Sequence, residues 1–229
     1  MTILTAIFAS VFVLPHAAQA QGADMSFQQR CEREMKPTLQ VSLREFGYRI
    51  DNTVSSRVLN NRSAHNYAGE LMLGMTALQS RAEVTIDAPA LQDAGSGREC
   101  IAPRISVELS FAPMEVYVAR EFSPASCSYR AILEHEMRHV KVYQTHLPRL
   151  DALVQAELGR RFGGHPLYAP SGKGIDLLDA YVDTSLRPLI KAELARIEAL
   201  QAALDTQEET FRISSACRGE LALNLGTRY

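Results

Sequence analysis

Apolar and polar residues alternate in several short segments of the first half of the chain, which is the pattern of half-buried β-strands. The segments span residues 39–50, 81–87 and 104–120. Pro113 interrupts the last of them. Because proline has no N–H to donate to a β-ladder, we expect it to bend this strand or to place it at a sheet edge. A short helix is predicted over residues 23–36.

The pattern changes to a helical period from Ser128 onward, and Gly163 and Gly164 end this stretch. A second helical stretch follows the segment 163–174, which is predicted to be a loop, and runs to about residue 212. The apolar stripe of the second stretch is Leu186, Ile190, Leu194, Ile197, Leu200 and Leu204. Two helices joined in this way predict an antiparallel hairpin over about 128–213, with kinks at Pro148 and Pro188 that lie at similar heights.

These elements predict an α+β fold, in which a small, mostly antiparallel sheet packs on the first helix of a long C-terminal antiparallel hairpin. A chain of 229 residues with 46% hydrophobic content is long enough for one domain, which we place at residues 21–229. The formal net charge is -2 and the basic residues are scattered, which argues against nucleic acid or an anionic membrane surface as a partner.

The first twenty residues are uncharged, contain an apolar run and end in Ala18-Gln19-Ala20, which has the form of a signal-peptidase site. We expect residues 1–20 to be a signal peptide and the mature chain to start near Gln21, without a stable membrane span. The expected location is the periplasm or the extracellular medium. An uncleaved apolar anchor is the alternative, but about 14 apolar residues is short for a span.

Four cysteines, at positions 31, 100, 127 and 217, follow the expected cleavage site. An even number of cysteines in an exported chain suggests two disulfides, for which three connectivities exist. The hairpin brings Cys217 back toward Cys127, so we favour that pair and, by elimination, Cys31 with Cys100. Metal binding by these cysteines is less favoured because no two of them form a C-x-x-C pair.

The first helical stretch contains His135-Glu136-Met137-Arg138-His139, an HExxH motif. Two histidines four residues apart lie on one face of a helix and can share a zinc ion, with the intervening glutamate beside a metal-bound water. In that arrangement Glu136 acts as general base, and the activated water attacks a carbonyl group. The alternative is a pair of histidines with only a structural role.

The chain also resembles a family of predicted secreted bacterial zinc-dependent proteases. The similarity lies in residues 46–50 (FGYRI), in Cys100 and the alternating strand that follows it, and in residues 133–140 (LEHEMRHV), and it covers roughly residues 45–160. It implies zinc peptidase activity in the cell envelope, carried by His135, Glu136 and His139.

A catalytic zinc ion usually has three protein ligands, so a third donor is expected. Glu193 is the favoured candidate, because it falls within the apolar stripe of the second arm, where an unpaired carboxylate would be costly. Glu198, His146 and the pair Asp179 and Asp183 are the alternatives. Tyr143 and Tyr181 are candidates for stabilising an oxyanion, or are core residues with a solvated hydroxyl.

The sequence therefore predicts an exported zinc metallopeptidase that acts on peptides or proteins, with the strand over residues 106–118 offering an edge to an extended substrate. Three alternatives stay open: an amidase that acts on cell-wall peptide, a zinc-stabilised binding protein without activity that uses its hairpin, and a metal-free envelope protein. The sequence indicates no oligomeric state.

Overall fold

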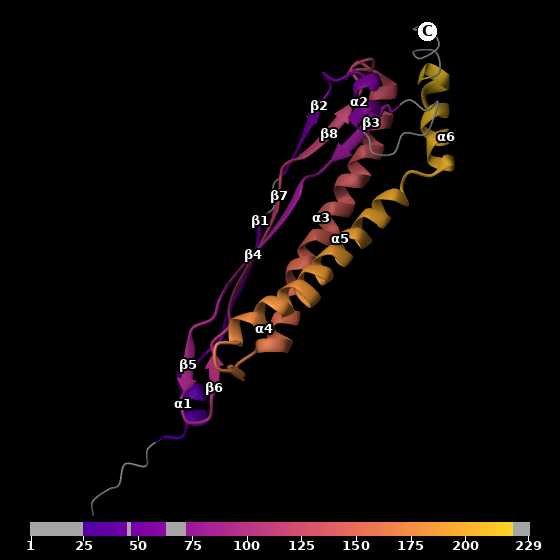
Figure 1. The fold of residues 1–229 in the computed structure, drawn as a ribbon. Helices are drawn as coiled ribbons and strands as arrows, with labels where there is room; N and C mark the ends of the chain where they lie inside the picture. The colour runs from indigo at the N-terminus through magenta and orange to yellow at the C-terminus, as the bar shows by residue number, and fades with distance from the viewer. Residues whose placement is uncertain (1–24, 45–46, 63–71, 222–229) are drawn as a thin grey trace, which may run out of the picture.

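The structure is a computed structural model that describes residues 25–44, 47–62 and 72–221. The fold is α+β and elongated, with a narrow layer of strands running beside two long helices (Figure 1). The expected signal peptide and its cleavage site lie outside the described residues. No described helix is long and apolar enough to cross a membrane.

The middle of the strand layer is a three-stranded sheet. Its central strand is β7 (Arg104–Phe111), which pairs in parallel with β1 (Thr38–Arg44) and antiparallel with β4 (Ser80–Asp87). Along β7, alternate residues are buried, so one face of the sheet faces the helices. The strand predicted over residues 81–87 is confirmed as β4.

A second three-stranded sheet lies next to the first, toward one end of the molecule. β8 (Met114–Val118) follows β7 and lies between β2 (Tyr48–Asp51), which is parallel to it, and β3 (Gly74–Ala77), which is antiparallel. Pro113 lies between β7 and β8, so the predicted single strand is interrupted there and its two parts belong to different sheets. The edge placement was wrong, because both strands are paired on two sides.

The opposite end of the layer is closed by a third sheet, of order β5-β6-β9, in which both pairings are antiparallel. β5 (Ala90–Asp93) and β6 (Arg98–Ile101) form a hairpin, and β9 (Leu167–Pro170) adds to the free side of β6. The segment predicted as the hairpin loop therefore contains a strand. Residues 39–50, predicted as one strand, form the two strands β1 and β2.

The first arm of the predicted hairpin is one helix, α3 (Cys127–Phe162), which begins at the N-cap Ser126. Ser126 accepts a hydrogen bond from the backbone N–H of Tyr129, which satisfies one of the free donors of the first turn. The helix continues through Pro148. Its buried residues face either the sheet or the second arm: Ser128, Ile132, His135, Glu136, His139, Val140, Tyr143, Leu147, Leu150, Val154, Leu158 and Phe162.

The second arm is made of shorter pieces. α4 (Gly174–Tyr181) is followed by a π-helical turn, Val182–Leu186, and by α5 (Arg187–Ala202), which has Pro188 in its first turn. The arm was predicted to continue to about residue 212, but α5 ends at Ala202, and a turn leads into α6 (Gln207–Ser215). This break is where the candidate site is completed.

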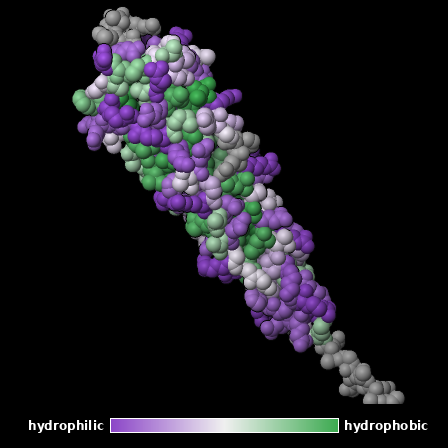
Figure 2. Space-filling model, turned by 180° about the vertical axis from the view of Figure 1, so that it is seen from behind, coloured by the Kyte–Doolittle hydropathy of each residue, from purple (hydrophilic) through white to green (hydrophobic). Residues whose placement is uncertain are grey.

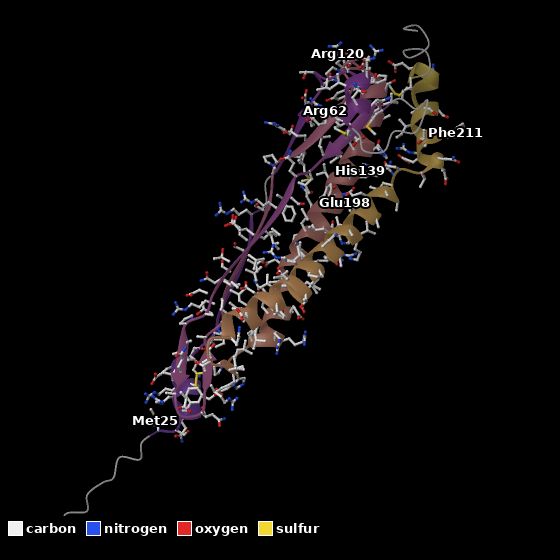
Figure 3. All side chains as sticks on the ribbon, viewed as in Figure 1. Met25, Arg62, Arg120, His139, Glu198 and Phe211 are labelled. Atoms are coloured by element: carbon white, nitrogen blue, oxygen red, sulfur yellow. A yellow bond between two sulfur atoms is a disulfide. The ribbon has the colours of Figure 1, made fainter. Side chains whose placement is uncertain are left out.

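Both favoured disulfides are present. Cys31 of α1 (Phe27–Glu34) bonds Cys100 of β6, and Cys127 at the start of α3 bonds Cys217, which follows α6. The two disulfides lie at opposite ends of the molecule (Figure 3). The second bond holds the chain after α6 to α3.

Two hydrophobic clusters stabilise this arrangement. The larger lies between the sheet layer and the hairpin, and a smaller one lies at the β2-β8-β3 end, where α2 (Ser56–Arg62) also packs. The members of the smaller cluster are Leu59, Val118, Ala119, Phe122, Ile132 and Leu221. On the face shown in Figure 2, apolar residues lie in separate patches between hydrophilic ones.

A buried carboxylate fixes the start of α4. Glu99 of β6 is 2% exposed and accepts hydrogen bonds from the backbone N–H groups of Gly172 (2.7 Å) and Gly174 (2.6 Å). Burial alone would raise the pKa of Glu99, but these backbone donors and the side chain of Gln92 outweigh it and lower the pKa. A Cβ atom at position 174 would lie 2.9 Å from this carboxylate, so glycine is required there.

We predict that Glu99→Gln lowers the free energy of unfolding at pH 7 by about 1–2 kcal/mol, because hydrogen bonds to a charged acceptor are lost. A lowered pKa stabilises the fold above the unfolded value of about 4.3, and this contribution is lost as pH falls through the folded value. The difference from wild type, measured by urea unfolding, should therefore shrink between pH 7 and pH 3. The control is Glu83→Gln on β4, where the carboxylate is exposed. An equal, pH-independent effect of both changes would contradict this account.

Candidate metal centre

The HExxH residues occupy core positions of α3. His135, Glu136 and His139 are 8%, 4% and 8% exposed, and they lie in the stripe that otherwise contains apolar residues such as Ile132 and Val140. Burying polar side chains is costly unless they are paired or bind an ion. Polar residues at these positions therefore point to a site.

The chain break after α5 brings a carboxylate to the two histidines. Asp205 Oδ1 lies 3.0 Å from Nε2 of His135 and 3.0 Å from Nε2 of His139, and the two Nε2 atoms are 3.1 Å apart. The three atoms thus form a nearly equilateral triangle of potential ligand atoms. Figure 3 shows His139 on α3 beside α5, well away from Met25.

This donor set fits a zinc ion. Zinc binds imidazole nitrogen and carboxylate oxygen at about 2.0–2.2 Å in tetrahedral geometry, which places neighbouring ligand atoms about 3.3 Å apart. The three distances between these atoms, 3.0, 3.0 and 3.1 Å, are close to that value. Two imidazoles and one carboxylate are also the ligand types of many catalytic zinc sites, which leave a fourth position for water or substrate.

The second arm also contacts the other ring nitrogen of each histidine. Nδ1 of His139 lies 2.7 Å from Oε1 of Gln201, whose Nε2 donates to the backbone carbonyl of His139 at 3.2 Å. Nδ1 of His135 lies 3.1 Å from Oε1 of Glu209 on α6. Such outer contacts orient metal-binding imidazoles.

The carboxylate of Glu136 is held from the sheet side of α3. The hydroxyl of Thr76 on β3 donates to its Oε2 at 2.9 Å. Gly74, on the same strand, lies so close that a Cβ atom there would be 2.5 Å from Oε1 of Glu136 and 2.7 Å from Ile132. The strand β3 therefore fixes where this carboxylate lies.

Burial and neighbouring charges shift the pKa values of Glu136, His139 and Asp205 in opposite directions. Burial raises the pKa of Glu136, against the effect of the nearby histidines. For Asp205, burial is outweighed by hydrogen bonds with His135 and His139, which hold the pKa well below its ordinary value. Burial likewise disfavours charged His139, but Asp205 and Glu136 outweigh it and raise the pKa of this imidazole. Of these three groups, the carboxylate of Asp205 is the one that the shifts keep ionised, so it contributes negative charge beside the two Nε2 atoms.

Glu193, the favoured third ligand, is not in this group and is replaced there by Asp205. Glu193 forms an ion pair with Arg196 (2.5 Å), which, together with smaller charge effects, outweighs burial and lowers its pKa. The register of the two arms explains the difference. Gln201 faces His139 and Arg196 approaches His146, so Glu193 lies further along α3, beyond the motif.

The other residues considered as a third ligand contact different side chains or lie away from the two histidines. Glu198 accepts a hydrogen bond from the hydroxyl of Tyr143 (3.1 Å). His146 lies 3.5 Å from Arg149 and from Arg196. Asp183 pairs with Arg187, and Asp179 is exposed on α4, at the other end of the hairpin (Figure 1).

The two candidate oxyanion residues are both hydrogen-bonded. Tyr143 donates to Glu198, and burial with that carboxylate raises its pKa. Tyr181 donates to Glu157, and its pKa is raised to about 12, mainly by burial. Tyr181 belongs to α4, far from the motif (Figure 1).

Sequence reasoning missed Asp205, Gln201 and Glu209, although a signal was present. Thr206 and Glu209 have the spacing of a capping box, which predicts that a new helix begins there. The structure confirms that Thr206 caps α6 by accepting the N–H of Glu209 at 3.1 Å. The carboxylate of Glu209 turns to His135 instead.

A second group, Cys127, Cys217 and Glu220, also brings potential ligand atoms together. Because both sulfur atoms are joined in a disulfide, they are not thiolate ligands. The histidine group is therefore the candidate metal site.

Comparisons of this chain with known proteins give no matching family model, no matching curated protein and no matching solved structure.

We predict that the purified protein binds about one zinc ion per chain. His139→Ala and Asp205→Ala should each lower the zinc affinity by at least tenfold, because each removes one of three ligands. Glu193→Ala should leave the affinity within about twofold of wild type. Mass spectrometry of metal content and titration against a chromophoric chelator measure these effects. Retained affinity in Asp205→Ala, or its loss in Glu193→Ala, would contradict the ligand set.

Proposed function

We propose that this protein is an exported, zinc-dependent metallopeptidase with His135, His139 and Asp205 as metal ligands and Glu136 as general base. The observation that carries the proposal is the convergence of two Nε2 atoms and one carboxylate oxygen, with the buried Glu136 on the same helical turn. The resemblance to secreted zinc-dependent proteases around residues 133–140 supports the same chemistry.

When bound in such a site, zinc polarises a carbonyl oxygen and lowers the pKa of water. Glu136 would accept the proton of the attacking water and later deliver it to the leaving amine. The hydroxyl of Thr76 donates to Oε2 of Glu136 and so orients this carboxylate. The burial that raises the pKa of Glu136 brings it closer to the range in which one group can both accept and donate a proton.

The substrate is proposed to lie along β3. In the part of the chain that the structure describes, β3 pairs only with β8, so its other side is an edge. β3 also holds Thr76 against Glu136. An extended peptide that adds to this edge would pass beside the general base. The edge first expected at residues 106–118 is not open, because β7 and β8 are central strands.

Two independent features support export of this chain. Two disulfides are compatible with an oxidising compartment, as expected for an exported chain. The uncharged apolar segment that ends at Ala20 has the form of a signal peptide. Export is therefore part of the proposal.

The proposal is tested with Glu136→Gln, which preserves size and removes the base. Peptide hydrolysis, measured by mass spectrometry on a peptide library, should fall by about 10²–10⁴-fold. Zinc content should not change. The matched control is Glu134→Gln, two residues away and exposed, which should retain full activity.

Two results would count against this mechanism. Hydrolysis that survives in Glu136→Gln would exclude Glu136 as the base. Stoichiometric zinc without hydrolysis of any peptide or cell-wall peptide by the wild type would instead support a zinc-stabilised binding protein.

We further predict that Gly74→Ala lowers the turnover rate by more than tenfold. The added Cβ would lie 2.5 Å from Oε1 of Glu136 and must displace this carboxylate or the strand. Zinc affinity should change by less than about threefold, because the ligands are on α3 and the second arm. Steady-state kinetics and the zinc titration together separate the two effects, and unaltered turnover would show that the position of Glu136 is not critical.

A further inference from the structure

Two large apolar side chains are exposed on β2, the strand at the opposite edge of its sheet from β3 (Figure 1). Tyr48 and Ile50 are 44% and 45% exposed. Their partners in the parallel register, Met114 and Val116 of β8, are 3% and 0% exposed. Because paired residues share one face of a sheet, the apolar face of β8 that α3 covers continues onto β2, and there it is open to solvent.

The backbone of the same two residues is directed toward the outer side of β2. The N–H of Met114 donates to the carbonyl of Gly47 at 3.0 Å. In a parallel ladder only every second residue bonds a given neighbour, so Tyr48 and Ile50 turn their N–H and C=O groups away from β8. Among the described strands, none pairs with that side of β2. An apolar edge of this kind is a template for another strand.

The sequence of β2 is complementary to a second copy of itself. If two copies pair antiparallel about a two-fold axis at Ile50, the two isoleucines lie opposite each other and exchange backbone hydrogen bonds. Arg49 of each copy then lies opposite Asp51 of the other, at the positions where cross-strand side chains come closest. The side chain of Arg49 is 73% exposed even though it pairs with Glu115 of β8, so it can reach a second carboxylate.

Other registers of the same strand lack this match. A two-fold axis at Arg49 would place two guanidinium groups directly opposite each other, which is destabilising. An axis at Tyr48 would place Arg49 opposite Gly47, with no charge to pair. The charges of β2 therefore favour the axis at Ile50.

We infer that β2 is a dimer interface, at which two copies of this chain pair antiparallel about Ile50. The two three-stranded sheets then form one continuous sheet of order β3-β8-β2-β2-β8-β3. β3 stays at both outer edges, so dimerisation leaves the proposed substrate edge open, and the inference depends on neither zinc nor hydrolysis. Because one short strand from each copy makes the pairing, the dimer is expected to be weak, with a Kd in the micromolar range.

Sedimentation equilibrium of the purified chain tests the interface. Wild type should show a concentration-dependent equilibrium between monomer and dimer. Ile50→Lys should weaken dimerisation by about tenfold or more, because two ammonium groups would meet at the axis. Ile50 is exposed in the monomer, so the variant should fold, which circular dichroism checks. The control is Phe211→Lys on α6, which changes an apolar residue that is 71% exposed and should leave dimerisation unchanged.

A charge exchange tests the register. Arg49→Glu alone places a carboxylate opposite Asp51, and Asp51→Lys alone places an ammonium group opposite Arg49, so each variant should self-associate about tenfold more weakly or worse. An equimolar mixture of the two variants restores opposite charges at both positions and should dimerise within a few-fold of wild type. If either change merely disrupted β2, the mixture would stay monomeric, and that result would overturn the inference.

Two further results would also overturn it. A wild type that stays monomeric up to millimolar concentration would leave the edge of β2 to another extended chain or to no partner. A dimer that is disrupted by Phe211→Lys and not by Ile50→Lys would place the contact on α6 instead.

Discussion

The packing of α3 on the successive strands β7 and β8 is the contact on which the rest of the structure depends. Alternate residues of β7 face the helix, and the helix presents an apolar stripe of three- and four-residue spacing to them. Burying each large side chain of this stripe contributes about 1.5–3 kcal/mol. Because His135, Glu136 and His139 belong to the same stripe, the packing that stabilises the fold also fixes the orientation of the motif.

The sheet contacts one side of the HExxH motif, and the second arm of the hairpin contacts the other. β3 contacts Glu136 through Thr76 and Gly74, whereas residues 201–209 contact both histidines. Glu136 and the two histidines are therefore contacted by different parts of the chain.

The sequence predicted the parts of the fold that depend on local pattern. The α+β class, the hairpin, the position of the motif in a helix and both cysteine pairs are confirmed, because periodicity and topology determine them. The zinc and the activity stay predictions. The third member of the site was missed because its place depends on the register of two long arms and on a helix break after Ala202, which the apolar stripe through Leu204 concealed. Pro113 was predicted to bend the strand or to place it at an edge, and the structure instead accommodates it in a break between two central strands.

The bond between Cys127 and Cys217 has a consequence for the order in which the site is assembled. The two histidines come together as soon as α3 forms, since they are neighbours on one helix. Asp205 and Glu209 are some 70 residues away in sequence, and the chain that follows them is held to α3 by this disulfide. Reduction removes that restraint, and loop-closure entropy then favours a detached segment. A newly made chain in a reducing compartment would thus form the histidine pair before Asp205 is secured beside it, and oxidation would be the step that completes the candidate site.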